Sequence, residues 1–208
     1  MLKRLIDITA STIAIIILSP VLWSVSLCII ALDGQPVLFR QMRVGRFGRD
    51  FLLFKFRTMS QKPDAEKGAF DAGDASRITP LGKILRKTKL DELPQLWNVL
   101  RGDMSIVGPR PEVRKWVNAY PERWANVLTV RPGITDPASI VYRDEEMLLA
   151  AASDPERHYR NSILPHKLEL YENYVRNQSF CGDLGLILKT IAAVVRPLTT
   201  AHIERRKS

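Results

Sequence analysis

Two adjacent carboxylates, Asp91 and Glu92, lie next to a run of basic residues and are the strongest candidates for chemistry in this sequence. Three cations, Arg86, Lys87 and Lys89, precede them within five residues. Such a set can hold a divalent ion and a polyphosphate together, because carboxylates bind hard cations and Arg or Lys side chains clamp phosphate. Phosphoryl transfer needs these parts and an oxygen nucleophile. An acidic helix start surrounded by solvated lysines explains the same residues, and both interpretations stay open at this point.

Other basic side chains can join a phosphate site. Several are arginines beside prolines, whose restricted backbone suits a phosphate clamp but is also common in structural turns. No Walker loop, GxGxxG, GxSxG or HExxH motif is present, so the commoner nucleotide-binding and hydrolase signatures do not apply. The histidines are scattered and the two cysteines lie far apart, which argues against a zinc site and a disulfide framework. The candidate phosphate-binding or nucleotide-binding residues are Arg86, Lys55, Arg57, Arg110, Arg131 and Arg143.

The charge balance favours an anionic partner. The 208 residues include 31 Lys and Arg against 22 Asp and Glu, a net charge of +9. Nucleic acid, an acidic membrane surface or a phosphorylated substrate would each complement this charge. A membrane-tethered scaffold for acidic lipids or nucleic acid would explain the charge, but not the carboxylates beside the basic run. The length suits one domain, or one domain with a membrane anchor.

The first element that could position these candidate residues is an apolar segment, Ile8–Leu32, which has no charged residue over 25 residues. As a helix it would be roughly 37 Å long, enough to cross a bilayer core of about 30 Å. It is too long for a signal peptide and has no cleavage site. Ser19-Pro20 interrupts the segment, because proline bends a helix. Basic residues flank both ends of the segment, and because such residues favour the cytoplasmic side, both ends qualify as cytoplasmic. A re-entrant helix kinked at Ser19-Pro20 satisfies both signals; a kinked full span and a buried helix remain alternatives.

The rest of the chain reads as a mixed, mainly helical domain. Val37–Arg43 and Phe51–Met59 have the composition of strands in a hairpin, and 60–76 reads as a loop. Leu81–Leu100 is expected to be mostly helical, with a helix starting close to Asp91. Glu112–Val127 is expected to form two short helices, because Pro121 interrupts it. Its aromatic stripe, like the apolar segment Leu184–Val195, fits either a core or a membrane interface; beside a membrane anchor the interface is the preferred interpretation of the stripe. The stripe consists of Trp116, Tyr120 and Trp124.

Taken together, these residues carry a family resemblance that covers nearly the whole chain. The combined motifs resemble those of the bacterial sugar transferases, the monotopic polyprenyl-phosphate phosphoglycosyl transferases. The chain is most similar to the small form, which has only the catalytic domain and its re-entrant helix. The motifs, in order, are Lys3-Arg4 with Asp7, Gly34-Gln35-Pro36-Val37, Arg43-Val44-Gly45, Lys55-Phe56-Arg57-Thr58-Met59, Thr79-Pro80-Leu81-Gly82, Leu90-Asp91-Glu92-Leu93-Pro94-Gln95-Leu96, Gly102-Asp103-Met104-Ser105, Val107-Gly108-Pro109-Arg110-Pro111 and Arg131-Pro132-Gly133-Ile134-Thr135.

The resemblance implies an α+β, mainly helical fold at the cytoplasmic face of the bacterial inner membrane. It implies a re-entrant membrane helix (1–33), a catalytic domain (34–197) with a small β-hairpin and amphipathic interfacial helices, and a basic tail (198–208). By resemblance, Asp91 attacks the β-phosphate of a UDP-sugar, releases UMP and forms a phosphosugar-aspartyl intermediate. Polyprenyl phosphate, typically undecaprenyl phosphate, then accepts the phospho-sugar. This is the first membrane step of a glycan or glycoconjugate pathway.

The implied cofactor is Mg²⁺, held at Asp91 and Glu92 with the substrate phosphates. Glu92 is implied in positioning the metal or phosphate, or as a base for the lipid phosphate. The implied partners are the UDP-sugar, the polyprenyl phosphate and inner-membrane lipids, and no nucleic acid; the oligomeric state is left open. The sequence departs from the family's best-known small enzymes after Thr135, where Arg143 keeps its place in the run 137–143 but the Trp, Gln, Asn and Gly of those enzymes are replaced. The identity of the sugar therefore cannot be transferred, and the unusual insert 144–162 could reshape the sugar side of the site.

Overall fold

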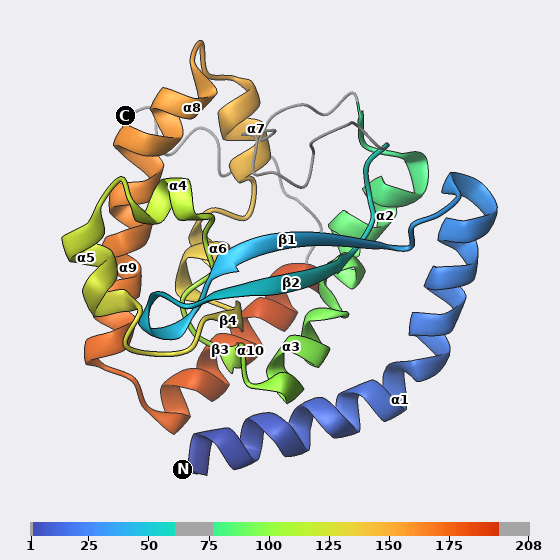
Figure 1. Ribbon diagram of the computed structural model, residues 1–208, viewed down its shortest axis with the longest axis horizontal. Helices are drawn as coiled ribbons and strands as arrows, with labels where there is room; N and C mark the ends of the chain where they lie inside the picture. Colours follow the sequence, from blue (N-terminus) through green and yellow to red (C-terminus); the bar gives the residue numbers. More distant parts are fainter. Residues whose placement is uncertain (1, 61–76, 196–208) are drawn as a thin grey trace.

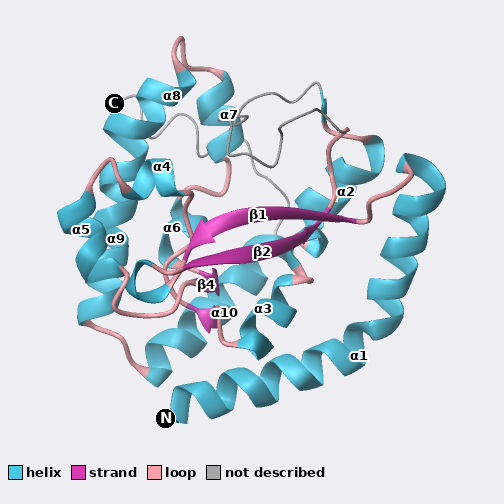
Figure 2. Cartoon of the chain, in the orientation of Figure 1, coloured by secondary structure: helices cyan, strands magenta, loops and turns pink. Residues whose placement is uncertain are grey.

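The computed structural model describes residues 2–60 and 77–195. Within these ranges the chain is mainly helical and carries two small two-stranded sheets, so the expected α+β, mainly helical class is confirmed (Figure 2). The expected loop at 60–76 lies outside the described residues except for Ser60, and the basic tail 198–208 lies entirely outside them.

Helix α1 (Leu2–Asp33) contains the whole apolar segment and is assigned as helix throughout, with Pro20 inside it. It is long and apolar enough to cross a membrane by length and composition, and 6% of its most apolar window is buried. In Figure 1 it runs along one edge of the molecule and then turns along a second edge. The large apolar side chains exposed on α1 are Leu2, Leu5, Ile8, Ile13, Ile16, Ile17, Trp23, Leu27, Ile30 and Leu32.

The first turns of α1 are attached to the folded body through polar side chains. Arg4 donates to the carbonyls of Val99 and Leu100, at 2.5 and 2.9 Å, at the end of helix α3 (Gln95–Arg101). The buried carboxylate of Asp7 accepts bonds of 3.1 Å from the hydroxyl of Ser105 and from the amide of Ile106. A buried carboxylate is tolerated when donors satisfy it, so Asp7 fixes the position of α1 against strand β3 (Ser105–Val107).

The predicted hairpin is confirmed. Strand β1 (Leu38–Val44) pairs antiparallel with β2 (Asp50–Phe56), from Leu38 opposite Phe56 to Val44 opposite Asp50. A short 3₁₀ turn, η1 (Arg46–Gly48), connects the strands, and Gly48 adopts the left-handed φ of 73° that glycine tolerates best. Apolar residues of β2 point into the core, while Lys55 reaches the candidate site.

The helical region around the acidic pair is arranged differently from the prediction. Helix α2 (Pro80–Thr88) is capped at its start by the side chain of Thr79 and is followed at Lys89 by a left-handed residue, with φ of 59°. A 3₁₀ turn, η4 (Leu90–Glu92), follows, and α3 starts only at Gln95. Leu81–Leu100 is mostly helical as expected, but α3 starts four residues after Asp91 rather than close to it. The reason is local: Lys89 reverses the backbone and Pro94 lies before the first turn of α3.

The second sheet is a parallel pair of three-residue strands, β3 and β4 (Gly133–Thr135). Two glycines, Gly108 directly after β3 and Gly133 at the start of β4, let the two backbones approach closely. A Cβ atom on Gly133 would lie 2.1 Å from the nitrogen of Gly108, and one on Gly108 would lie 2.4 Å from the carbonyl oxygen of Arg131. No side chain fits at these distances, so the close approach depends on glycine at both positions.

The main core is built by the short helices and α9. Helices α4 (Arg114–Val117) and α5 (Pro121–Val127) are separate, as Pro121 predicted. The preferred interfacial interpretation of the aromatic stripe is wrong, since Trp116 and Trp124 are 5% and 1% exposed. They pack against residues of the π-helix η5 (Tyr159–Ile163) and of α9 (Leu164–Arg176), where burial of large rings stabilises the fold.

Three short helices follow β4: α6 (Pro137–Val141), α7 (Glu145–Ala150) and α8 (Pro155–His158). Helices α7 and α8, together with most of η5, occupy the 144–162 insert. The last described helix, α10 (Phe180–Val195), contacts α6, β3 and β4, on the side of the molecule where α3 also lies (Figure 1). Its large exposed apolar side chains are Phe180, Leu184, Leu188 and Ile191.

Candidate active site

The acidic pair lies in η4, held between α2 and α3. Both carboxylate residues are buried, Asp91 with 7% and Glu92 with 8% of its surface exposed. The left-handed backbone of Lys89 turns the chain out of α2, so the pair is presented on a tight turn rather than on a helix face. Helix α2 itself is fixed by Gly82, because any Cβ there would lie 2.1 Å from the carbonyl oxygen of Thr58. Packing and turn geometry thus determine where the two carboxylates point.

Glu92 is held by two cations from distant parts of the chain. Lys55 of β2 contacts its Oε1 at 2.9 Å, and Arg110 contacts the same oxygen at 2.6 Å. The second oxygen, Oε2, receives only a 3.5 Å contact from Arg110. Burial by itself raises the pKa of Glu92, but Arg110 and Lys55 outweigh it and hold that pKa well below its usual range. Glu92 is therefore ionised over the whole physiological pH range.

Asp91 has the opposite environment. Its Oδ1 is buried and has no hydrogen-bond partner. Burial raises the pKa of Asp91, and the charge of Glu92 adds to that effect, while Lys55 and Lys89 act in the other direction. A buried carboxylate oxygen without a donor is more basic and less solvated than an ordinary one. The two neighbours thus differ chemically: Glu92 is paired, and Asp91 is available to react.

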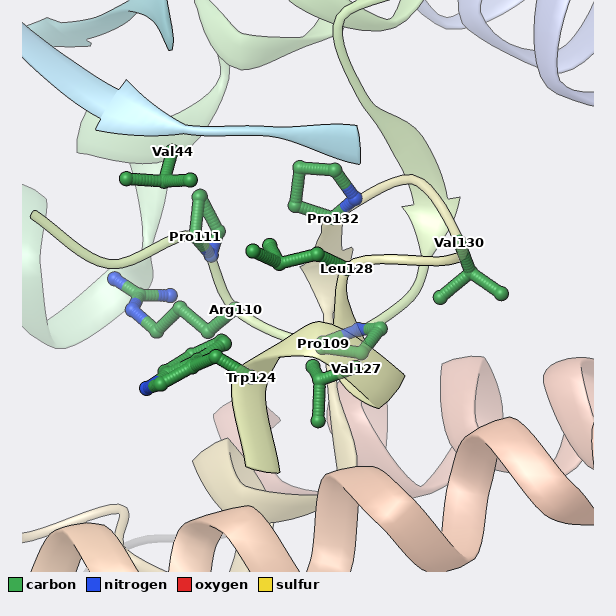
Figure 3. A pocket seen from close by; sticks show the side chains of 9 residues that line it. All are labelled: Val44, Pro109, Arg110, Pro111, Trp124, Val127, Leu128, Val130 and Pro132. Atoms are coloured by element: carbon green, nitrogen blue, oxygen red, sulfur yellow. The ribbon is translucent and has the colours of Figure 1, made fainter. Parts of the chain in front are cut away.

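Arg110 reaches Glu92 because its backbone is fixed on both sides. Pro109 and Pro111 flank it, and the amide of Gly133 donates to the carbonyl of Pro109 at 2.9 Å. Figure 3 shows Arg110 among the residues lining a small cavity, with the ring of Trp124 close by. That cavity measures about 10 Å³, at the lower limit for a single water, so this region is packing rather than a ligand site. The attraction of Glu92 raises the pKa of Arg110 well above its usual value.

A larger pocket, of about 140 Å³, opens beside Glu92. Cationic side chains from three separate segments line it, and α10 forms one wall. Arg110 and Arg143, both expected at the site, are brought together here with Glu92. The lining residues are Lys89, Glu92, Leu93, Leu96, Arg110, Ile134, Thr135, Ser139, Ile140, Arg143, Thr190 and Ala193.

The other predicted phosphate-binding arginines have different surroundings. Arg86 donates to the hydroxyl of Thr58 at 2.9 Å and to the carboxylate of Glu146 at 2.6 Å. Both terminal nitrogens of Arg57 donate to backbone carbonyls of residues 33–35, at the end of α1 and directly after it. Arg131 donates through Nε to the carbonyl of Gly102 at 2.8 Å. Arg57 and Arg131 therefore donate to backbone carbonyls. Arg86, in contrast, forms an ion pair with the side chain of Glu146.

The structure adds residues that sequence reasoning did not assign to the site. Lys89 was expected only as one of the neighbouring cations, and its place on the pocket wall follows from the left-handed turn. Glu146 belongs to the insert and approaches Arg86 from α7. Thr190 and Ala193 come from α10, about 100 residues after the acidic pair. No spacing in the sequence signals that α10 reaches the site, because its register against β3 and β4 is a tertiary feature.

The donor set is not a complete protein-made metal site, but it fits a magnesium ion whose remaining ligands are substrate phosphates and water. In the ranges 2–60 and 77–195, no group of three or more His, Cys, Asp or Glu side chains is placed to hold a metal. Asp91 Oδ1 has no partner, and Glu92 Oε2 has only the 3.5 Å contact. Mg²⁺ is commonly bound by one or two carboxylates together with substrate phosphates and water, so these two oxygens suit an ion that arrives with its substrate.

Comparison with known proteins decides the family. The family described as bacterial sugar transferase matches residues 1–197. The chain belongs to this family. It is 38% identical to an uncharacterized sugar transferase of Bacillus subtilis over 93% of this chain and 87% of that one. It is 36% identical to an Aeromonas hydrophila protein named UDP-N-acetylgalactosamine-undecaprenyl-phosphate N-acetylgalactosaminephosphotransferase, over 93% of this chain.

Several relatives are longer than this chain. The match covers 44% of the Aeromonas protein. It covers 40% of a Salmonella typhimurium protein named undecaprenyl-phosphate galactose phosphotransferase, which is 35% identical over 94% of this chain. The matched region is therefore common to relatives whose names specify different sugars.

Proposed function

We propose that this bacterial sugar transferase moves a phospho-sugar from a UDP-sugar to polyprenyl phosphate, with undecaprenyl phosphate as the acceptor and UMP as the first product. The observation that carries the proposal is the contrast between the two buried carboxylates. Asp91 has an unpartnered oxygen and a raised pKa, while Glu92 is held ionised by Lys55 and Arg110. The named activities of the Aeromonas and Salmonella relatives support the same reaction class.

The first step is attack by the Asp91 carboxylate on the β-phosphorus of the UDP-sugar. A new bond forms between the aspartyl oxygen and phosphorus, and the bond between phosphorus and the bridging oxygen breaks, so that UMP leaves. In the second step a phosphate oxygen of the polyprenyl phosphate attacks the same phosphorus. The aspartyl–phosphorus bond breaks, the carboxylate is restored and a lipid diphosphate sugar is formed. Covalent catalysis of this kind divides one difficult displacement into two easier ones.

Residues around the pair supply charge and orientation. Lys55 and Arg110 neutralise Glu92, so that anionic phosphates can approach the turn, and Lys89 and Arg143 face the pocket where phosphate would bind. Asp91 and Glu92 would hold Mg²⁺, which when bound neutralises the diphosphate charge. The fixed backbone of η4 holds the attacking carboxylate in one orientation, which reduces the entropy lost in reaching the transition state.

We further propose that α1 is a re-entrant membrane helix and that the catalytic body lies on the cytoplasmic face of the inner membrane. Pro20 has no amide hydrogen, so it leaves the carbonyl of Ile16 without its helical partner. The hydroxyl of Ser19 donates to that same carbonyl at 2.8 Å. Ser19-Pro20 thus allows a bend while keeping the backbone satisfied in an apolar surrounding, where an unsatisfied carbonyl is costly.

The attachments at the two ends of α1 support the same topology. Arg4 and Asp7 tie its first turns to α3 and β3. At the other end, Arg57 binds the carbonyl of Asp33, and Thr79 donates to the side chain of Asp33 at 2.9 Å. Both ends are thereby held by the same folded body, whereas the apolar middle is exposed. A helix that crossed the bilayer completely would have its ends on opposite sides.

The reaction is tested by incubating the purified protein with a panel of UDP-sugars, undecaprenyl phosphate and Mg²⁺. We expect UMP release with at least one sugar, dependent on the lipid for multiple turnovers. A membrane scaffold with a basic surface would release no UMP across the panel, and that result would overturn the proposal. For topology, cysteines introduced near residues 2 and 34 should both resist a periplasmic thiol reagent, and labelling of only one would indicate a complete span.

A further inference from the structure

The 140 Å³ pocket beside Glu92 combines an apolar lining with a cationic rim. We propose that it is the acceptor site: it binds the phosphate of the prenyl phosphate at the rim and the adjoining isoprene unit against the wall formed by α10. This assignment rests on the proposed reaction, which requires two anionic substrates of different character. One substrate carries a polar nucleoside, and the other carries an apolar chain directly on its phosphate.

The apolar part of the lining suits a hydrocarbon. Leucine and isoleucine side chains from α3, β4, α6 and the turn before α3 form most of it, and Ala193 adds a small residue from α10. An engineered apolar cavity of about 150 Å³ takes up benzene, a ring of six carbons. A pocket of about 140 Å³ therefore has room for one five-carbon isoprene unit. Apart from the charged rim, the lining side chains with hydroxyl groups are Thr135, Ser139 and Thr190. The uracil and ribose of a nucleotide would therefore leave polar groups unpaired against the leucine and isoleucine side chains.

The charged part of the lining suits one phosphate. Lys89, Arg110 and Arg143 contribute three cations, against the single carboxylate of Glu92. That carboxylate is already neutralised by Lys55 and Arg110, at 2.9 and 2.6 Å, so the rim keeps a net positive charge. Asp91 precedes Glu92 directly and interacts electrostatically with Lys89 and Arg110 of the rim, so a phosphate bound there would lie near the carboxylate that carries the phospho-sugar.

A polar atom in the wall provides an independent observation. The hydroxyl of Thr190 is buried and has no hydrogen-bond partner, although it lies on α10 where the pocket is lined. Buried hydroxyls are nearly always bonded, so an unpartnered one beside a cationic rim is placed to donate to an anion. The outer face of α10 exposes Leu184, Leu188 and Ile191. A helix with one face on the pocket and an apolar outer face gives the remaining chain of the lipid an apolar surface to follow.

Two neighbouring alanines of α10 provide a matched test, since Ala193 lines the pocket and Ala192 is exposed. Farnesyl phosphate, a short prenyl phosphate, is titrated into the detergent-solubilised protein by calorimetry without any UDP-sugar. We expect Ala193→Trp to raise Kd at least tenfold and Ala192→Trp to change it less than twofold. Thr190→Val should raise Kd roughly fivefold, the equivalent of one ordinary hydrogen bond. If Ala193→Trp does not fold, as judged by thermal denaturation, Ala193→Leu replaces it.

The same preparations are assayed for turnover, so that the pocket and the reaction are tested separately. We expect Ala193→Trp to raise KM for the lipid more than KM for the UDP-sugar. Farnesyl phosphate binding equally well to both tryptophan variants would overturn the pocket assignment, even if wild-type protein releases UMP. A larger effect on KM for the UDP-sugar would also overturn it, because the pocket would then serve the donor. Pocket-dependent binding without UMP release from wild type would support the site and overturn the reaction.

Discussion

The two neighbouring carboxylates differ so much in their surroundings that neutralising each should change stability in a different way. Replacing Glu92 by Gln removes the anion shared by Lys55 and Arg110 and leaves two cations close together. Replacing Asp91 by Asn removes a buried charge whose Oδ1 has no donor. We therefore expect Glu92→Gln to destabilise the protein and Asp91→Asn to leave it equally stable or more stable. Both substitutions keep the side-chain volume, so packing contributes little to the difference.

The magnitude follows from the exposure of the groups. Breaking a buried ion pair by removing one partner costs about 3–5 kcal/mol. The side chains of Lys55 and Arg110 are 20% and 28% exposed, so water reaches both cations and the lower end of that range applies. For a domain of this size 1 kcal/mol corresponds to about 2–4 °C in Tm, which gives a loss of roughly 6–12 °C for Glu92→Gln. For Asp91→Asn we expect a gain of up to about 1 kcal/mol.

The assay is thermal denaturation in detergent at several pH values, with Glu122→Gln on the exposed face of α5 as a control. The pKa of Glu92 is lowered in the folded protein, so its stabilisation is complete above the unfolded value of about 4.3 and is lost as pH falls through the folded value. The difference between wild type and Glu92→Gln should therefore persist at pH 5–8. Equal losses for Glu92→Gln and Asp91→Asn, or no loss for Glu92→Gln, would refute the distinction between the carboxylates.

Three further outcomes follow from the site geometry. Burial raises the pKa of Asp91, so UMP release should begin to fall at a pH above the ordinary aspartate pKa of about 3.9. An activity that is flat down to pH 4 would contradict this. Glu146→Gln should break the ion pair with Arg86 and leave Arg86 available to the substrate. KM for the UDP-sugar should then fall by up to roughly fivefold, which corresponds to the free energy of an exposed ion pair. A raised KM would show instead that Glu146 assists binding. Gly133→Ala should lower the free energy of unfolding by about 1–3 kcal/mol and remove most of the activity, because the added Cβ would press on Gly108 and displace Arg110. A variant with wild-type Tm and turnover would argue against this dependence on glycine.

The sequence was most informative where local rules and family motifs agree. The hairpin of β1 and β2 follows from strand composition around a glycine-containing turn, and the break between α4 and α5 follows from Pro121. Lys55, Arg110 and Arg143 could be named as candidate site residues from their motifs, and the structure brings all three to Glu92 or to its pocket. Their roles toward a substrate remain predictions.

The structure differs from the sequence-based predictions where tertiary contacts overrule local conformational preference. A lysine in a left-handed conformation is uncommon, so no rule would place the end of α2 at Lys89. An aromatic stripe looks the same whether it faces lipid or core, and only the packing of η5 and α9 decides that Trp124 is buried. The backbone contacts of Arg57 and Arg131 are likewise invisible in a motif, because an arginine that binds phosphate and one that binds carbonyls have the same neighbours in sequence.

The central claim is that Asp91 carries the phospho-sugar. It is tested most directly by incubating the protein with a UDP-sugar accepted in the UMP assay, labelled in its β-phosphate, without any lipid. After rapid denaturation, the wild-type protein should retain label on the peptide containing Asp91, and polyprenyl phosphate added before denaturation should remove it. Asp91→Asn should retain none. Label on another residue, or full turnover by Asp91→Asn, would contradict the account.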